Sequence, residues 1–296
     1  MPTTAAIPAD CGNIDLLGET LARRLQHVWQ RARTDRRVVY ALLAIGLIGP
    51  LGWVESVPVR PSEGVEQVHA AIEQLPRGST VLLAADYDPA AAPELQPFVR
   101  AALRLAFDRD LNVVAVSLWP QAPHLVRAAF LDVQDSGVRY GRDFVNLGYK
   151  AGGLLVISQL GESVAAAYPT DSRQRPVTEL PLMAKLGSVA DADLLLSVAS
   201  GSPGTLEWVA QRPARFQGKI LAATTSSWVA DLKPLVASGQ LGGIVDGVMG
   251  AAAFEQLVDH PAEASAAMGA VGVGQLVWLL LVAAAAVSGL WRRWQG

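Results

Sequence analysis

The chain has 296 residues, of which 51% are hydrophobic and only 17% are charged, and its formal net charge is −3. Soluble domains usually carry about 25% charged residues, so this composition argues against a protein that is entirely surrounded by water. The slight excess of acidic residues also argues against nucleic acid as a partner, because phosphate binding needs clustered Lys and Arg.

The N-terminal segment 1–37 is predicted to form a basic, amphipathic tail. Apolar residues recur at helical spacing from Ile14 to Trp29, and six arginines stand against four acids. This pattern is typical of a helix lying on an anionic membrane surface, and equally of a plain basic extension of a membrane-spanning helix. The single cysteine, Cys11, lies in this tail, so the rest of the chain has no disulfide.

Two uncharged windows follow the pattern of membrane-spanning helices. The second, 264–291, exceeds the ~20 residues that a spanning helix needs. The first, 38–54, is short and contains Pro50, but arginines precede it and Trp53 marks its far end as an interfacial aromatic would. We predict transmembrane helices over 38–54 and 263–291, with a re-entrant segment as the alternative for the first.

The arginines predict the orientation of the chain in the membrane. The tail 1–37 is rich in Arg, and the short tail 292–296 contains Arg292 and Arg293, which places both termini in the cytoplasm. The segment from Glu55 to Glu263 carries 16 Lys and Arg against 23 Asp and Glu. The sequence therefore predicts a protein of the bacterial inner membrane, embedded in the lipid bilayer, whose globular domain 55–262 is extracytoplasmic.

Within 55–262, short apolar runs alternate with helical patterns, which predicts an α/β fold. Strands are expected at 79–87, 111–119, 143–149, 192–200 and 219–227. Helices are expected at 63–75, 94–109, 121–136, 152–160, 204–211, 229–238 and 246–258, with a last one starting near Pro261. The runs suit buried strands, so we expect a doubly wound, mostly parallel sheet of five or six strands, Rossmann-like or flavodoxin-like. The stretch 163–186 fits least and is expected to be an inserted loop or an added edge strand.

Ligands of such sheets bind beyond the carboxyl ends of the strands, so polar residues there are the candidates for binding. They are Asp86, Asp88, Lys150, Gly152, Asp171, Ser200, Ser202, Thr224 and Thr225.

Asp86 and Asp88 lie two residues apart, so in an extended segment both side chains point to one side and could hold a cation or act as acid and base. The alternative is a turn that caps the next helix. Lys150 precedes Gly152 at a strand end, where it could meet an anion; otherwise it is a solvated lysine beside a tight turn.

The remaining candidates have weaker signals. Ser202 suits a helix cap, and both Ser200 and Ser202 are weak candidates for a nucleophile, since no Gly-x-Ser-x-Gly elbow is present. Thr224 and Thr225 could line a polar pocket, and Asp171 could act as a lid residue or be a plain loop acid. The histidines are scattered without metal-ligand spacing, so no metal is predicted, and no cofactor is assigned.

The second predicted span contains a stripe of small residues, Ala266, Ala270 and Gly274, on which another helix could pack closely. Gly46 and Gly49 make the first span one candidate; a membrane-protein partner or a second copy of the chain are others.

Four strings occur in order between the two windows: "LLAADYDPAAAPELQP", "VNLGYKAGG", "YPTD" and "ASGQLGGIVDGVMGAAAFEQL". By these the chain resembles an uncharacterised family of bacterial two-span membrane proteins with a Rossmann-like domain between the spans, which implies no particular activity. In architecture it is also similar to extracytoplasmic amidotransferase-like or type 1 periplasmic-binding-like domains tethered beside ABC transporters. The nucleophilic cysteine of the amidotransferase-like domains is absent from 55–262.

Two hypotheses for function follow. The first is a membrane-tethered, non-catalytic binding or assembly module, accessory to a transporter or envelope complex, that takes a small polar or anionic ligand or a protein partner. The second is a membrane-anchored hydrolase or transferase that uses Asp86, Asp88 and Lys150. The first is preferred because the sequence lacks a recognisable set of nucleophile, base and metal ligands.

Overall fold

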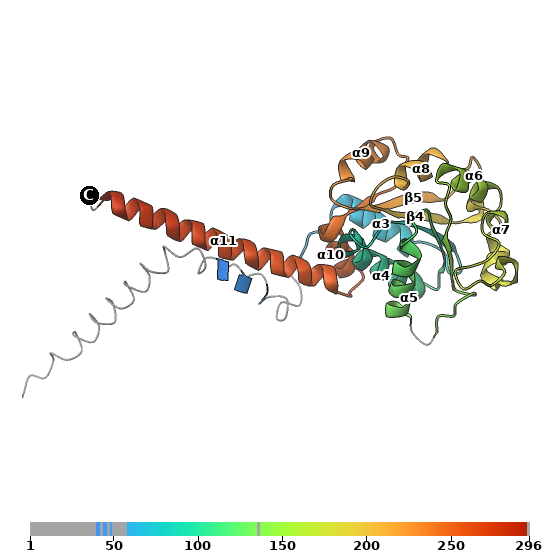
Figure 1. Cartoon of the computed structure of the whole chain (residues 1–296), viewed down its shortest axis with the longest axis horizontal. Helices are drawn as coiled ribbons and strands as arrows, with labels where there is room; N and C mark the ends of the chain where they lie inside the picture. The colour runs from blue at the N-terminus through green and yellow to red at the C-terminus, as the bar shows by residue number, and fades with distance from the viewer. Residues whose placement is uncertain (1–39, 42–43, 46–47, 49–57, 135–136, 295–296) are drawn as a thin grey trace, which may run out of the picture. The chain divides into compact units, whose positions relative to one another are not determined.

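The computed structural model describes residues 40–41, 44–45, 48, 58–134 and 137–294 (Figure 1). Within them, a six-stranded parallel sheet has the order β3-β2-β1-β4-β5-β6. Its strands are β1 (Thr80–Asp86), β2 (Asn112–Ser117), β3 (Phe144–Tyr149), β4 (Leu194–Ala199), β5 (Lys219–Thr224) and β6 (Ile244–Asp246). The order reverses between β1 and β4, as in a Rossmann-like sheet and unlike a flavodoxin-like one.

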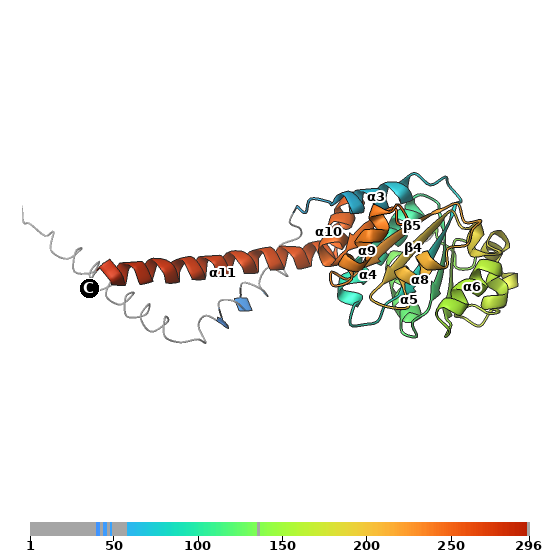
Figure 2. The same ribbon diagram turned by 90° about the horizontal axis from the view of Figure 1, so that it is seen from above.

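Helices cover both faces of the sheet, as Figures 1 and 2 show, and each face has its own hydrophobic core. One face packs on α3 (Glu63–Glu73), α4 (Ala92–Asp108), α5 (Ala122–Val133) and α10 (Gly247–Leu257). The other packs on α6 (Leu154–Glu162), α7 (Val164–Ala167), α8 (Thr205–Ala210) and α9 (Val229–Ala237). Because β1, β2 and β4 are buried along their whole length, their sequences are largely apolar.

The five strands and the helices predicted within 55–262 are confirmed, with bounds that differ by a few residues at most. The sixth strand, β6, is missed by the sequence pattern. It has only three residues and is followed directly by α10, so its apolar signal merges with that of the helix. The strand is defined by the parallel pairing of its backbone with β5 and not by a sequence pattern of its own.

The stretch 163–186, predicted as an inserted loop or an added edge strand, adds no strand to the sheet, and neither do the residues that follow it up to 191. Together these residues form α7 and three short 3-10 turns, η2 (Val177–Glu179), η3 (Pro181–Lys185) and η4 (Val189–Asp191), with one isolated bridge between Thr170 and Pro176. The Ser172 N–H donates to the carbonyl oxygen of Asn146 in β3, at 2.9 Å. The alternative of an inserted loop is therefore the correct one, and this loop lies along the edge strand and protects it.

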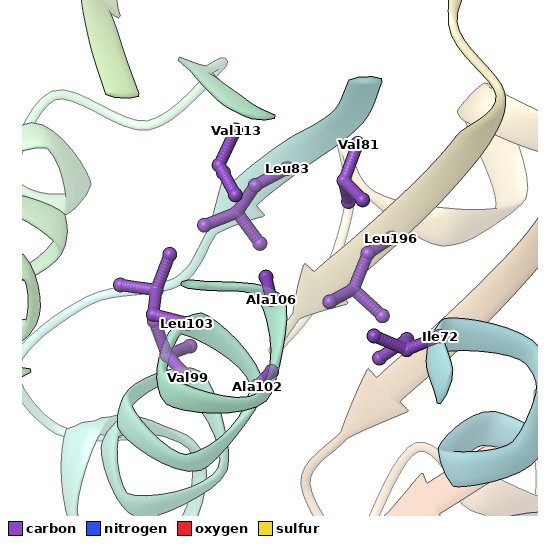
Figure 3. A pocket seen from close by; sticks show the side chains of 9 residues that line it. All are labelled: Ile72, Val81, Leu83, Val99, Ala102, Leu103, Ala106, Val113 and Leu196. Atoms are coloured by element: carbon purple, nitrogen blue, oxygen red, sulfur yellow. The ribbon is translucent and has the colours of Figure 1, made fainter. Parts of the chain in front are cut away.

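A small void lies between the sheet and helices α3 and α4. Figure 3 shows apolar side chains from both layers, such as Leu83, Leu103 and Ile72, turned toward it. Its volume is about 10 Å³, too small for more than one water molecule, and its lining is apolar. It is a packing gap in the core and has no room for a ligand.

The last helix, α11 (Glu263–Trp294), begins close to its predicted start. Its segment Glu263–Ala283 has 21 residues and a mean hydropathy of 2.0, which is long and apolar enough to cross a membrane. The compact α/β unit ends at Gly269, within this helix. The predicted tail 1–37 lies outside the described residues, and so does most of the predicted first span 38–54.

The first turn of α11 is held by a buried carboxylate from α10. Glu255 is 1% exposed, and its Oε2 accepts the N–H groups of Ala262 and Ser265, both at 2.9 Å. Its Oε1 accepts the N–H of Ala264 at 3.1 Å. Helix N-termini leave such donors unpaired and favour negative charge, so Glu255 acts as a cap supplied by another helix.

Candidate functional site

Asp86, at the end of β1, is the most buried of the predicted site residues, with no exposed surface. Its Oδ1 accepts the N–H of Leu118, which follows β2, at 2.7 Å. Its Oδ2 accepts the indole N–H of Trp208, in α8, at 2.8 Å. Burial raises the pKa of this carboxyl to about 7, although both donors act to lower it. The carboxyl therefore joins three segments at the point where the strand order reverses.

Asp88 forms a turn between β1 and α4. Its Oδ1 accepts the N–H groups of Ala90 and Ala91, both at 3.0 Å, and its carbonyl oxygen accepts the N–H of Ala92 at 3.1 Å. Of the two alternatives that the sequence leaves open, the structure shows the turn, although the N-cap of α4 itself is Ala91, which has no side-chain cap.

This turn closes the position where a Rossmann-like sheet would hold the phosphates of a dinucleotide. The N–H groups before α4 are bound to Asp88, and Pro93 has none to offer. In addition, Glu94 lies in the first turn of α4. Its Oε2 accepts hydrogen bonds from the backbone N–H of Ser226, at 3.0 Å, and from the Ser226 hydroxyl, at 3.2 Å. A negative charge and occupied donors are the reverse of a phosphate cradle.

Lys150 follows β3 and is half-buried. Its ammonium donates to the carbonyl oxygen of Ala167 and lies 6.0 Å from the centre of the Tyr168 ring. The Tyr168 hydroxyl donates to the carbonyl oxygen of Ser117 at 3.2 Å, so this segment folds over the ends of β2 and β3. Gly152 has φ of +136°, a backbone conformation that favours glycine. Lys150 therefore ties a loop to the sheet.

The hydroxyl residues after β4 and β5 also bond within the domain. Ser202 donates to Oε1 of Glu207 at 2.5 Å, and Thr224 donates to the carbonyl oxygen of Ala199 at 2.8 Å. The hydroxyls of Thr225 and Ser227 lie 3.1 Å apart. Ser200 is half-buried, and its N–H donates to the carbonyl oxygen of Asp86 at 3.2 Å.

Asp171 lies apart from the other candidates, in the loop beside β3. Its side chain is fully buried. Its Oδ1 accepts hydrogen bonds from the backbone N–H groups of Arg173 and Arg175, and its Oδ2 accepts one from the Nε–H of Arg175 at 3.2 Å. This carboxylate organises its own loop. The structure thus brings Asp86, Lys150 and the hydroxyl residues to the carboxyl ends of the strands. Asp171 lies elsewhere, in the loop beside β3.

Two half-buried tryptophans at the carboxyl ends of the strands are missed by the sequence argument. The indole N–H of Trp119 donates to the carbonyl oxygen of Pro203 at 2.8 Å. A Cβ at Gly201 would lie 3.4 Å from the Trp119 ring and 3.8 Å from that of Trp228. Each tryptophan comes directly after a strand or its turn, the only signal in the sequence that could have suggested them.

Over the residues that the structure describes, no group of three or more His, Cys, Asp or Glu side chains is placed to hold a metal ion. No protein-family model, curated protein or solved structure matches the chain.

Proposed function

We propose that this chain is a membrane-anchored, non-catalytic binding or assembly module, accessory to a transporter or another envelope complex of the bacterial inner membrane. The observation that carries the proposal is the state of Asp86, whose two oxygens accept hydrogen bonds from Leu118 and Trp208 inside the domain. Asp88 and Lys150 are likewise engaged with the backbone. These contacts support structural roles for the residues that the alternative hypothesis would use for chemistry.

Membrane anchorage rests on the length and hydropathy of Glu263–Ala283 and on the apolar window 38–54. Membership of the two-span family that the sequence resembles is part of the same proposal. The small residues Ala266, Ala270 and Gly274 would then let α11 pack against another span, of this chain, of a second copy or of a partner.

Topology tests the anchorage. We expect a reporter that is active only outside the cytoplasm to work when fused after Gly64, and a reporter that is active only in the cytoplasm to work when fused after Gly296. The physical reason is the arginine content of both tails, which are retained on the cytoplasmic side. Exchanging the two reporters is the control and should silence both. A cytoplasmic signal after Gly64 would refute the orientation.

One observation favours the alternative of a hydrolase or transferase. A carboxyl pKa of about 7 is well placed for proton transfer near neutral pH. Under that alternative, turnover of a chromogenic ester or phosphate ester by the whole chain would be lost in Asp86→Asn. A binding module shows no such turnover in either protein.

A further inference from the structure

A pocket lies beside the edge strand β3, and none of the predicted site residues lines it. It has a volume of about 80 Å³ and is built by α5, the segment 140–146 and the loop that contains Ser172 and Arg173. This space suits a group of the size of a carboxylate or a phosphate. The three segments are separated in the sequence, so no local motif predicts the pocket.

Three of the five polar side chains that line this pocket are basic, and the other two, Asn146 and Ser172, are neutral. His124 and Arg127 reach it from α5 and Arg173 from the loop, and no Asp or Glu lines it. Across the described residues, Arg127 and Arg173 form no ion pair, whereas the neighbouring Arg175 is held by Asp171. A basic pocket in a domain with more acids than bases favours an anion at this one place.

One of these arginines is held in place before any ligand arrives. The guanidinium carbon of Arg173 lies 3.5 Å from the centre of the Tyr140 ring, so the group stacks on the ring face. The Tyr140 hydroxyl in turn accepts the N–H of Asn146 and donates to its carbonyl oxygen, both at 3.2 Å. A positioned guanidinium loses less freedom on binding than a free one.

Beside Pro123, Asn146 and Ser172, the lining contains three aromatic side chains. Phe130 and Phe144 are stacked with ring centres 4.1 Å apart, and Tyr140 meets both edge-on, at 6.2 and 5.8 Å. Oxyanions bind to guanidinium groups, and flat apolar groups bind to aromatic rings. Phe130 and Phe144 are buried, so the pocket offers its guanidinium groups to an oxyanion and the half-buried Tyr140 to an apolar group.

We propose that this pocket binds an oxyanion, a carboxylate or a phosphate monoester, carried on a flat apolar stem. The oxyanion contacts Arg127 and Arg173, and the stem contacts the aromatic side chains, chiefly Tyr140. The inference rests on the proposed function only for its binding role and moves that role from the strand ends to the sheet edge. It does not depend on the topology of the chain.

The test uses the whole chain in a non-ionic detergent and measures binding by isothermal titration calorimetry. The probes are phenyl phosphate, benzoate, inorganic phosphate and neutral phenol. The variants are Arg127→Gln and Arg173→Gln, with Arg215→Gln as the matched control. Arg215 is exposed and lies before β5, in the other half of the sheet, away from the pocket. Its replacement by Gln changes the net charge by the same amount as each pocket variant does. Circular dichroism verifies that each variant is folded.

We expect phenyl phosphate or benzoate to bind at one site per chain and more tightly than inorganic phosphate, and phenol not to bind. Each pocket variant should weaken binding about tenfold to a hundredfold, the usual loss of a hydrogen bond to a charged group, while Arg215→Gln should leave it unchanged. Equal weakening by all three variants, unchanged binding in both pocket variants, or no binding to the unmodified chain would overturn the proposal. A topology result of either kind leaves these outcomes as they are.

Discussion

Replacement of Asp86 by Asn is expected to destabilise the folded domain at pH 5 and to lose most of this effect by pH 8. The Asn oxygen can accept the N–H of Leu118, but the Asn amide would face the indole N–H of Trp208, donor against donor. Leaving that buried donor unpaired costs about 1–3 kcal/mol. This cost is what unfolding at pH 5 should report.

The loss of the effect at pH 8 follows from the raised pKa of Asp86. Because the pKa of Asp86 is about 7 in the folded chain and 3.8 for a free aspartate, the folded state holds a proton between these pH values that the unfolded state has released. The stability that this contributes is full below pH 3.8 and is lost as the pH rises through about 7, some 2–3 kcal/mol between pH 5 and pH 8. Asn has no proton to lose, so its stability lacks this dependence.

The measurement is chemical unfolding of the whole chain in detergent at pH 5, 6, 7 and 8, for the unmodified protein and for Asp86→Asn. Asp88→Asn is the matched control, since Asn caps a turn nearly as well as Asp, and it should change the free energy of unfolding by less than about 0.5 kcal/mol. If the unmodified and Asp86→Asn chains gave parallel curves from pH 5 to pH 8, Asp86 would not be the titrating group.

Replacement of Glu255 by Ala is expected to lower the free energy of unfolding by about 3–5 kcal/mol, because three N–H groups at the start of α11 lose a charged acceptor. Two of them, from Ala264 and Ser265, belong to buried residues, where water is a poor replacement. Hydrogen exchange at residues 262–265 should accelerate in the variant, and chemical unfolding should give the change in free energy.

Two companion variants give this result its meaning. Glu255→Gln keeps one acceptor oxygen and should lose less than Glu255→Ala. Glu263→Gln removes an exposed partner of Arg100, 2.6 Å away, and should cost no more than about 1 kcal/mol, as exposed ion pairs do. A loss in Glu263→Gln as large as that in Glu255→Ala would show that the cap has no special weight.

The strands and helices of this domain could be predicted because their signals are local. Runs such as Val81–Ala85 are apolar along their whole length, and the order of runs and amphipathic segments indicates a parallel sheet. The strand β6 carries too few residues for such a signal. The sequence also leaves open the choice between Rossmann-like and flavodoxin-like order, which depends on which side of β1 each later strand joins.

The candidate site was predictable in position but not in role. The sequence places Asp86 at a strand end, yet its partner Trp208 is 122 residues away, and nothing local indicates that bond. The pocket beside β3 escapes for the same reason, since Arg127, Tyr140 and Arg173 lie in three separate segments. Side-chain hydrogen bonds over long sequence separations decide whether a polar residue serves structure or ligand.

The pairing of β1 with β4 also shapes how the domain is made. A ribosome delivers β1, β2 and β3 before the whole segment 150–193, and only afterwards β4, which pairs with β1 from Val81 to Asp86. Until then the central strand of the finished sheet is an open edge, with unpaired backbone groups and apolar side chains that attract other strands. We therefore expect this nascent half-sheet to be prone to aggregation until β4 is made.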